Sequence, residues 1–428
     1  MMLFIAGDGE EEAEMAKGPI TIFWAEWDPA NYLQELCNIF TDETGIVANV
    51  ETTPWSDFQV KAFNEFAAHS DAYDIVVGDS QWLGRGATQG HYIELTDWIK
   101  ERGVDKSMAP ATIVAYAEYP KGSGRYWAVP VEGDACGWSY RKDKFEDPKE
   151  KAAFKKKYGY ELDIPDTWYQ LRDIAEFFYR PEENFYGVAI YTQKDYDAIT
   201  MGIENVLWAW GADLGDYDTY KVKGILNSRA GIESLEFYKE LYKFCPPDWV
   251  NAFFPENNMA MTEGIASMSM NYYAFFPALA NPEMSKYADV TGYFAMPEGP
   301  AARVAALGGQ GASIITYSKK QGAAFEWLEW FVKPENQSKW GDLGGYTCDL
   351  KTLKSEKFLN MTPYNRSFME TMQMVKDFWA VPEYAELLES CQRYWSGYVV
   401  ADQFTAKEAM DGIAEEWEVI FEKYGYYD

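Results

Sequence analysis

Apolar residues in the first part of the chain alternate between short continuous runs and longer stretches with helical spacing. The runs at 20–24, 46–50 and 73–77 are rich in β-branched or aromatic residues, which predicts strands. The stretches at 28–44 and 56–68 place apolar residues three and four positions apart, which predicts amphipathic helices. This β-α-β-α-β order predicts a parallel sheet with right-handed crossovers.

The rest of the chain continues this mixed pattern. Strand-like runs recur at 126–132, 265–270 and 290–296, and the segment after about residue 321 has mainly helical spacing. The charged segment at 142–157 contains a proline, and we interpret it as an exposed excursion. The pattern as a whole therefore predicts the α/β class.

The composition indicates a large, strongly acidic globular protein. A chain of 428 residues is too long for one ordinary hydrophobic core and predicts two domains or lobes. The formal net charge of −30 argues against binding to a phosphate backbone, so we expect no nucleic-acid partner. His69, His91 and the cysteines do not follow metal-ligand spacings, so we expect neither a metal nor a cofactor.

The hydropathy pattern predicts no membrane span, because no run reaches the roughly 18 apolar residues that such a helix needs. Residues 1–17 begin with a short apolar stretch and continue with an acidic one. We interpret them as a disordered leader remnant or tag.

Several short motifs follow one another with a characteristic order and spacing over roughly residues 18 to 350. Their order makes the chain resemble the extracellular solute-binding proteins of ABC importers, in the group that includes the maltose-binding protein. The motifs are Phe40–Ile46, Tyr73–Asp79, Trp82-Leu83, Leu95–Asp97, Tyr126–Glu132, Trp138–Phe145, Ile164–Trp168, Ala306–Gly311, Ser318-Lys319 and Gly344–Tyr346.

This resemblance implies the two-lobed periplasmic-binding-protein fold, with a ligand cleft and hinge strands between the lobes. The chain would cross between lobes near residues 129–131, 296–297 and 341–345, where prolines or glycines lie at element ends. The implied boundaries are 18–129 plus 298–342 for lobe 1, and 130–297 plus 343–428 for lobe 2.

Candidate ligand-binding residues follow the predicted strands or belong to the family-like motifs. Ligands of open α/β sheets bind beyond the carboxyl ends of the strands, and their pockets combine apolar walls with a few polar groups. Many of the chain's aromatic residues must be core whatever the function. The candidates are Glu26, Trp27, Trp55, Asp79, Ser80, Trp82, Glu132, Asp134, Trp208, Asn271, Tyr272, Tyr273, Gly308, Gly309, Gln310, Gly345, Tyr346, Arg366 and Trp395.

The glycine-rich stretch 308–311 has two interpretations. It is either a plain glycine hairpin or bulge, or a place where backbone and the Gln310 amide approach a hydroxylated solute. The resemblance favours the second. We then expect a bulky residue at Gly309 to weaken ligand binding while leaving the fold largely intact.

The function implied by the resemblance is capture of a sugar, oligosaccharide or polyol by lobe closure, followed by delivery to the membrane permease of an ABC transporter. The alternative on the same scaffold is a cationic solute such as a quaternary ammonium or polyamine, held by aromatic rings and carboxylates. A remote alternative is a carbohydrate-active enzyme with paired carboxylates such as Glu26 and either Asp79 or Glu132. We expect a monomeric, non-enzymatic protein in the periplasm or outside the cell, and leave open a lipid anchor in the precursor.

Overall fold

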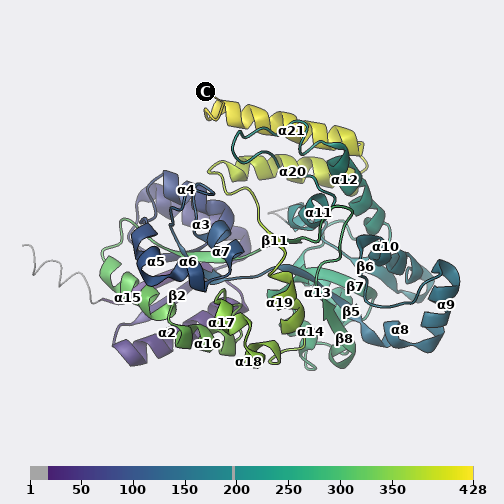
Figure 1. Ribbon diagram of the computed structural model, residues 1–428, viewed down its shortest axis with the longest axis horizontal. Helices are drawn as coiled ribbons and strands as arrows, with labels where there is room; N and C mark the ends of the chain where they lie inside the picture. The colour runs from purple at the N-terminus through teal and green to yellow at the C-terminus, as the bar shows by residue number, and fades with distance from the viewer. Residues whose placement is uncertain (1–17, 195–197, 428) are drawn as a thin grey trace, which may run out of the picture. The chain divides into compact units, whose positions relative to one another are not determined.

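The computed structural model describes residues 18–194 and 198–427, so the predicted leader remnant at 1–17 lies outside the described residues (Figure 1). Contacts within the chain divide it into two compact units, which are described separately. Unit 1 comprises the described residues through Gly133 together with Gly309–Phe358 and Ala380–Pro382. Unit 2 comprises Asp134–Gly308, Leu359–Trp379 and the described residues from Glu383 onward.

Unit 1 is built on a five-stranded sheet in the order β2-β1-β3-β10-β4. Strand β1 pairs in parallel with β2 and β3, whereas β10 is antiparallel to both β3 and β4. The elements are β1 (Ile20–Ala25), α2 (Asp28–Thr44), β2 (Ala48–Thr53), α3 (Trp55–Ala68), β3 (Ile75–Asp79), η1 (Ser80–Trp82), α4 (Leu83–Thr88), α5 (Thr96–Arg102), α6 (Val104–Ser107), α7 (Pro110–Tyr116), β4 (Val129–Glu132), β10 (Gln310–Ile314), α15 (Gln321–Phe331), α16 (Pro334–Leu343), α17 (Leu350–Leu353) and α18 (Glu356–Leu359), which reaches the boundary.

The predicted β-α-β-α-β order is confirmed in β1 to β3, and the parallel pairing follows it. Helix α2 buries the apolar face that the spacing predicts, including Leu33 and Phe40. It ends at Gly45, whose left-handed backbone (φ 79°) suits a residue without a side chain. Helix α3 packs Phe58 against Phe23 of β1, with ring centroids 5.2 Å apart. Contacts of this kind hold the helices against the sheet.

Unit 2 contains a four-stranded sheet in the order β6-β7-β5-β8 and a separate parallel pair, β9 with β11. Strand β7 is parallel to β6 and antiparallel to β5. The elements are β5 (Cys136–Arg141), α8 (Lys142–Glu146), α9 (Pro148–Tyr158), α10 (Trp168–Phe177), η2 (Pro181–Glu183), β6 (Tyr186–Ala189), α11 (Ala198–Ala209), α12 (Arg229–Tyr242), α13 (Phe254–Thr262), β7 (Ala266–Tyr272), η3 (Tyr273–Phe275), α14 (Pro277–Ala280), η4 (Ala288–Val290), β8 (Thr291–Phe294), β9 (Ala305–Ala306), α19 (Asn365–Thr371), β11 (Val375–Lys376), α20 (Tyr384–Val399) and α21 (Ala406–Lys423).

A group of helices completes unit 2. Helix α11 is buried on every side, and it packs against α12 and α20. Helices α20 and α21 lie side by side (Figure 1), and the Trp417 indole of α21 donates to the Leu387 carbonyl of α20 at 2.9 Å. The core of this part of unit 2 is therefore helical rather than sheet-based.

The observed units depart from the predicted lobe boundaries at residues 130–133, 298–308, 343–358 and 380–382, and the two longest departures have a visible cause. Residues 298–308 belong to unit 2, because β9 pairs with β11 and Leu307 bridges to Ala135. Residues 343–358 belong to unit 1, because Asp349 bridges to Met108. Both differences come from pairings between residues far apart in the chain.

Among the described residues, no helix is long and apolar enough to cross a membrane. The same residues hold no group of three or more His, Cys, Asp or Glu side chains arranged to bind a metal ion.

Candidate functional site

Several candidates meet at one edge of the unit 1 sheet. Ala25, the last residue of β1, pairs with Thr53 at the end of β2, and Gln310 at the start of β10 pairs with Asp79 at the end of β3. Gln310 also pairs with Glu132 at the end of β4. The carboxyl ends of four strands and the amino end of β10 therefore share this edge, which we call the unit 1 edge.

Three tryptophans lie at the β1 and β2 ends of the unit 1 edge. The rings of Trp24 and Trp27 meet edge to face with centroids 5.4 Å apart, and those of Trp27 and Trp55 do so at 5.2 Å. Trp24 is buried, whereas Trp27 and Trp55 are half-buried and Glu26 is exposed. Edge-to-face packing holds these rings in fixed orientations, so the half-buried indoles offer a preformed apolar wall.

Gln310 and Asp79 form the polar centre of the unit 1 edge. The Gln310 side-chain amide donates from Nε2 to Oδ1 of Asp79 at 2.7 Å, and both side chains are buried. Because this bond uses the amide nitrogen, the amide oxygen is left facing elsewhere. Within the described residues, Gln310 Oε1 and the indole Nε1 of Trp24 are buried without a hydrogen-bond partner.

Such unpaired buried groups normally cost free energy, about 1–3 kcal/mol each. One is an acceptor and the other a donor, and they belong to β10, which begins at the unit 1 edge, and β1, which ends there. A hydroxyl group can donate to the first kind and accept from the second. Trp24 was not among the sequence candidates, although its place near the end of an apolar strand was a usable signal.

Trp82 and Ser80 follow β3, but the Trp82 ring turns into the unit. It is 1% exposed and packs against Phe58 and Phe63, with centroids 4.7 and 5.4 Å apart. A methyl group on Gly78 would lie 3.3 Å from the ring. These contacts favour a packing role for Trp82, and its contact with a ligand stays a prediction.

Glu132 and Tyr346 are joined behind the unit 1 edge. Oε2 of the fully buried Glu132 accepts from the Tyr346 backbone N–H at 3.3 Å, and Gly133 donates to the Tyr346 carbonyl at 2.7 Å. A Cβ on Gly345 would lie 2.0 Å from the Trp340 ring. The 345–346 segment is thus fixed by packing within unit 1.

The glycines at 308 and 309 are required by close packing, which corrects the expected effect of substituting Gly309. A Cβ on Gly309 would lie 2.1 Å from the Glu132 carbonyl oxygen and 2.4 Å from the Tyr116 hydroxyl oxygen. In unit 2, a Cβ on Gly308 would lie 2.3 Å from the Tyr272 ring. A bulky residue at position 309 therefore disturbs the fold itself, because backbone atoms cannot move away cheaply.

In unit 2, the candidate Asp134 lies two residues before β5 and the candidate Asn271 lies near the end of β7, and both form hydrogen bonds within the unit. Asp134 Oδ1 accepts from the backbone N–H groups of Ala135 at 2.8 Å and Ala274 at 3.2 Å. Burial raises the pKa of the Asp134 carboxyl well above its ordinary value. Asn271 accepts from the Tyr191 hydroxyl and donates to the Phe254 carbonyl at 3.1 Å.

The neighbouring tyrosines are also enclosed within unit 2. Tyr273 is buried, and its hydroxyl lies 3.0 Å from Thr371 Oγ1. Tyr272 stacks on Tyr191 with centroids 6.5 Å apart. These contacts favour structural roles, and ligand contact by either tyrosine stays a prediction.

Trp208 of α11 faces a cation from its own chain. The Lys376 ammonium of β11 lies 5.4 Å from the centroid of the Trp208 ring and 5.8 Å from that of Tyr217. Lys376 also forms an ion pair with Asp213. Sequence reasoning missed Lys376 and Tyr217, because a two-residue strand such as β11 has no periodicity to detect.

The last two candidates lie among the helices of unit 2. Arg366 is exposed and donates to the Asn360 side chain at 2.6 Å. Trp395 is fully buried, and its indole donates to the Met410 sulfur at 3.2 Å between α20 and α21. Neither residue belongs to a strand end, since Arg366 is in α19 and Trp395 is in α20.

Residues 25–338 match the family model described as bacterial extracellular solute-binding protein. The chain belongs to this family. The erythritol/L-threitol-binding protein of Mycolicibacterium smegmatis is 20% identical over 365 residues, which span 80% of this chain and 72% of that protein.

Solved structures of solute-binding proteins share the fold over nearly the whole chain. An ABC transporter solute-binding protein from Agrobacterium radiobacter K84, in complex with ribitol, has a TM-score of 0.79 and 21% identity, covering 95% of this chain and all of that one (100%). Maltose-bound MalE3 of T. maritima also has a TM-score of 0.79, with 22% identity over 94% of this chain and 99% of that one. The predicted two-lobed α/β fold is confirmed.

Proposed function

We propose that the protein captures a sugar, oligosaccharide or polyol outside the cytoplasmic membrane and delivers it to an ABC permease. The observation that carries this proposal is the unit 1 edge, where half-buried indoles share one sheet edge with the unpaired buried acceptor of Gln310 and the unpaired buried donor of Trp24. Sugars and polyols present C–H surfaces to aromatic rings and hydroxyls that donate and accept. The ligands named for the erythritol/L-threitol-binding relative and the ribitol complex are of this kind.

The same observation weakens the cationic alternative. A trimethylammonium group has neither a donor for Gln310 Oε1 nor an acceptor for the Trp24 indole N–H, so of choline only the single hydroxyl could pair with them. A polyamine could donate to the first but would leave the second unpaired. The one aromatic cage that we describe with a nearby cation, around Trp208, already contains Lys376.

In the proposed mechanism, the tryptophans of the unit 1 edge orient the solute while Asp79 and Gln310 bind its hydroxyls. Closure of the two lobes would then be favoured by the ligand, because the closed form contacts it more extensively. We further propose that the protein is a monomer without catalytic activity or a nucleic-acid partner, and that a lipid anchor on the precursor would keep it near the permease.

Isothermal titration with maltose, mannitol, ribitol, erythritol, choline and spermidine tests the ligand class. We expect saturable binding by at least one sugar or polyol, in the micromolar range that corresponds to about −8 kcal/mol. Saturable binding by choline or spermidine alone would overturn the proposal.

A further inference from the structure

The proposed closure of the lobes requires a solute contact in unit 2, because a ligand favours the closed form only through contacts that the open form lacks. Two polar candidates of unit 2, Asp134 and Asn271, already form hydrogen bonds within the unit. A polar group with spare hydrogen-bonding capacity has to be sought elsewhere in unit 2.

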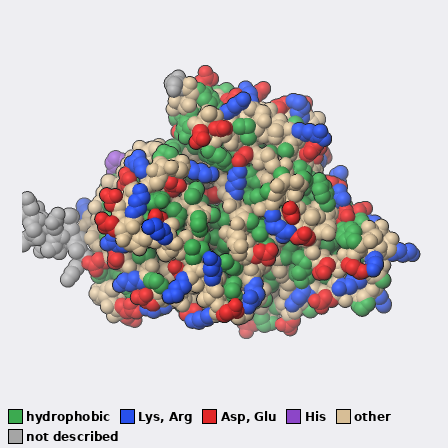
Figure 2. Space-filling model, in the orientation of Figure 1, with side chains coloured by type: hydrophobic (Ala, Val, Ile, Leu, Met, Phe, Trp, Pro, Cys, Tyr) green, Lys and Arg blue, Asp and Glu red, His purple; other side chains and the backbone are tan. Residues whose placement is uncertain are grey.

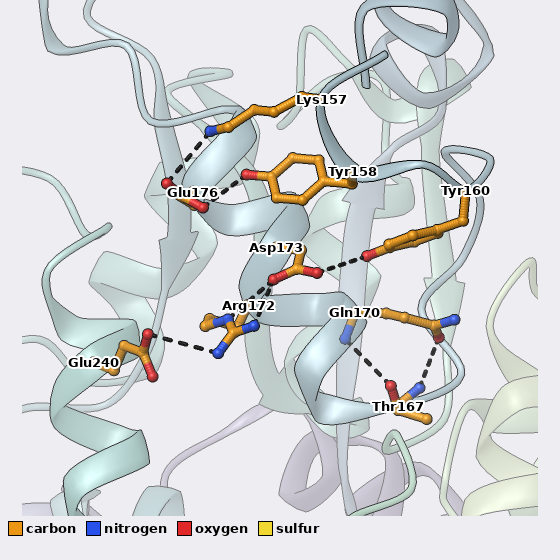
Figure 3. A network of polar contacts seen from close by, with 9 residues as sticks. All are labelled: Lys157, Tyr158, Tyr160, Thr167, Gln170, Arg172, Asp173, Glu176 and Glu240. Carbon is orange, nitrogen blue, oxygen red and sulfur yellow. Dashed lines mark hydrogen bonds and ion pairs between the residues drawn. The ribbon is translucent and has the colours of Figure 1, made fainter. Parts of the chain in front are cut away.

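Surface charge alone does not single out such a group. In the view of Figure 2, acidic and basic side chains are interspersed on the face that is drawn. In the network of Figure 3, the Arg172 guanidinium lies within ion-pair distance of two carboxylates, Asp173 at 2.7 Å and Glu240 at 3.7 Å. In the same network, Glu176 accepts from the Tyr158 hydroxyl at 2.8 Å. These groups join α9, α10 and α12, so their role is structural.

Lys376 differs from these groups because its ammonium has few partners and stays accessible. It forms an ion pair with Asp213. Across the part of the chain that the structure describes, Asp213 is the one hydrogen-bond acceptor of this ammonium. An ammonium has three N–H donors, so two remain for a solute. The Lys376 side chain is 28% exposed, and a small solute can therefore reach it.

The Lys376 ammonium is oriented by its aromatic and carboxylate neighbours. Its Nζ lies 5.4 Å from the centroid of the Trp208 ring and 5.8 Å from that of Tyr217, distances over which a ring attracts a cation. Asp213 also accepts from the Tyr217 hydroxyl at 2.9 Å, so the carboxylate that holds the ammonium is itself held. A donor fixed in this way loses little conformational entropy when it binds a solute oxygen.

Strand β11 places Lys376 beside the glycine-rich stretch. It pairs with β9, and the Leu307 backbone N–H donates to the Lys376 carbonyl at 2.8 Å. Leu307 is followed directly by the stretch 308–311, which contains Gln310 of the unit 1 edge. Backbone hydrogen bonds thus tie Lys376 to the segment that leads to the proposed solute site. Because these bonds do not involve the lysine side chain, a substitution at position 376 should leave β11 in register.

The surroundings of Lys376 are rich in negative charge. Burial raises the pKa of the Tyr217 hydroxyl well above its ordinary value. Asp213, by its charge and its hydrogen bond, and the charges of Glu204 and Asp377 raise this pKa further. Lys376 adds a positive charge to this group of carboxylates. Its removal would leave negative charge that attracts a cation from solution.

We propose that Lys376 is a solute-binding and specificity-determining residue of unit 2. This inference rests on the proposed function and deepens it. The ammonium donates hydrogen bonds to hydroxyl oxygens of the solute, and its charge disfavours a solute that carries an ammonium group of its own. The solute is therefore a neutral sugar or polyol without an amino group. Lys376 belongs to the β9–β11 pair rather than to the four-stranded sheet, whose edge residues are satisfied internally.

Calorimetric titration with neutral and cationic solutes tests this role. Wild type, Lys376→Met and Lys376→Arg are titrated with maltose, mannitol, ribitol and erythritol, and with choline and spermidine. The matched control is Lys239→Met, also in unit 2. Lys239 forms an ion pair with Asp402, lies 4.3 Å from the Tyr398 ring centroid and has a side chain that is 21% exposed. Thermal melting checks that all four proteins are folded.

We expect Lys376→Met to bind the sugar or polyol that wild type prefers about 30-fold more weakly, because a hydrogen bond from a charged group is lost. Lys376→Arg should recover part of this affinity, since it keeps the charge and the donors. Choline and spermidine should bind Lys376→Met more tightly than wild type, a gain that a purely structural role does not produce.

Two results would overturn this inference and leave the proposed function intact. One is a Lys376→Met protein with wild-type affinity for the preferred sugar or polyol. The other is an equal loss of affinity in Lys376→Met and Lys239→Met. A wild-type protein that binds no sugar or polyol would instead overturn the proposed function, and the role of Lys376 with it.

Discussion

The two sheet edges that carry most of the candidates differ in how their polar side chains are hydrogen-bonded. At the unit 1 edge, the buried Gln310 amide oxygen and the Trp24 indole N–H have no partner among the described residues. At the corresponding end of the unit 2 sheet, Asp134 accepts from two backbone N–H groups and Asn271 is bonded to Tyr191 and Phe254. Similar residue types at similar strand ends thus have different uses.

This difference indicates which edge is prepared for a ligand. A polar group already satisfied by its own backbone has little to gain from a solute, and losing it damages the fold. An unpaired group held in place by packing gains a partner only when a solute arrives. We therefore expect substitutions in unit 2 to act mainly on stability and those in unit 1 to act mainly on affinity.

The largest effect should come from Asp134→Ala. Removing the carboxylate leaves the buried N–H groups of Ala135 and Ala274 unpaired, so the free energy of unfolding should fall by about 3 kcal/mol. Urea denaturation measures the change. The exposed Asp289 of unit 2 supplies the control, and Asp289→Ala should change stability by less than about 0.5 kcal/mol. An Asp134→Ala protein of wild-type stability would remove the contrast between the edges.

Gly309→Ala should destabilise unit 1 by about 2 kcal/mol, because its Cβ would overlap the Glu132 carbonyl. The control is Gly18→Ala, whose Cβ would make only an ordinary 3.5 Å contact with the Lys320 side chain. Denaturant midpoints of both proteins measure the difference. A Gly309→Ala variant that loses affinity but not stability would restore the expectation drawn from sequence alone.

Asp79→Ala should weaken solute binding about 30-fold with a smaller effect on stability. The carboxylate orients the Gln310 amide through the 2.7 Å bond, so its loss frees the side chain that offers Oε1. Calorimetric titration of the solute identified for wild type gives the ratio of dissociation constants. Asp97→Ala, on the exposed face of α5, should bind as wild type does. Equal affinities for Asp79→Ala and wild type would show that the unit 1 edge does not contact the solute.

Local patterns predicted much of the fold but not its long-range pairings. The elements from β1 to β3 followed from apolar periodicity, and Gly45 was recognisable as a helix end. The insertion of β10 between β3 and β4 was not predictable, because it joins segments more than 170 residues apart. The segment at 142–157, expected to be an exposed excursion, forms α8 and most of α9, because Phe145 and Phe154 pack inward and Tyr158 and Glu150 bond to Glu176 and Arg180.

The candidate site was also predictable only in part, because local sequence shows where a strand ends but not which distant residues lie beside that end. A polar or aromatic residue after a strand is visible in the sequence, as with Trp27, Asp79 and Asn271. Whether that residue faces a solute or its own backbone depends on neighbours supplied by distant segments. Tyr191, which is 80 residues from Asn271, decides the matter in unit 2.

The smallest predicted effect is a difference between the two units in how their stability depends on pH, because both histidines of the chain lie in unit 1. His91 is buried against Phe66, with ring centroids 5.0 Å apart. Burial lowers its pKa, and the charges of His69 and Arg85 lower it further. The Tyr317 hydroxyl, 3.4 Å from Nδ1, faces the same ring.

The unfolded state therefore takes up a proton on this residue first as the pH falls. The stability that neutral His91 contributes is fully present above its unfolded-state pKa of about 6.5 and is lost as the pH falls below that value. The loss stops once the pH is below the lowered pKa of His91 in the folded state. As the pH falls from about 7.5 to 5.5, amide hydrogen exchange in β1–β3 of unit 1 should lose protection by a few-fold, where protection is the intrinsic exchange rate at each pH divided by the measured rate. Exchange in β5–β7 should change less, since unit 2 has no histidine. His91→Phe should abolish most of the unit 1 response. His69→Phe should abolish only a part of it, because burial of His91 lowers its pKa more than the charge of His69 does. Equal responses in the two units would show that His91 does not control the pH dependence of unit 1.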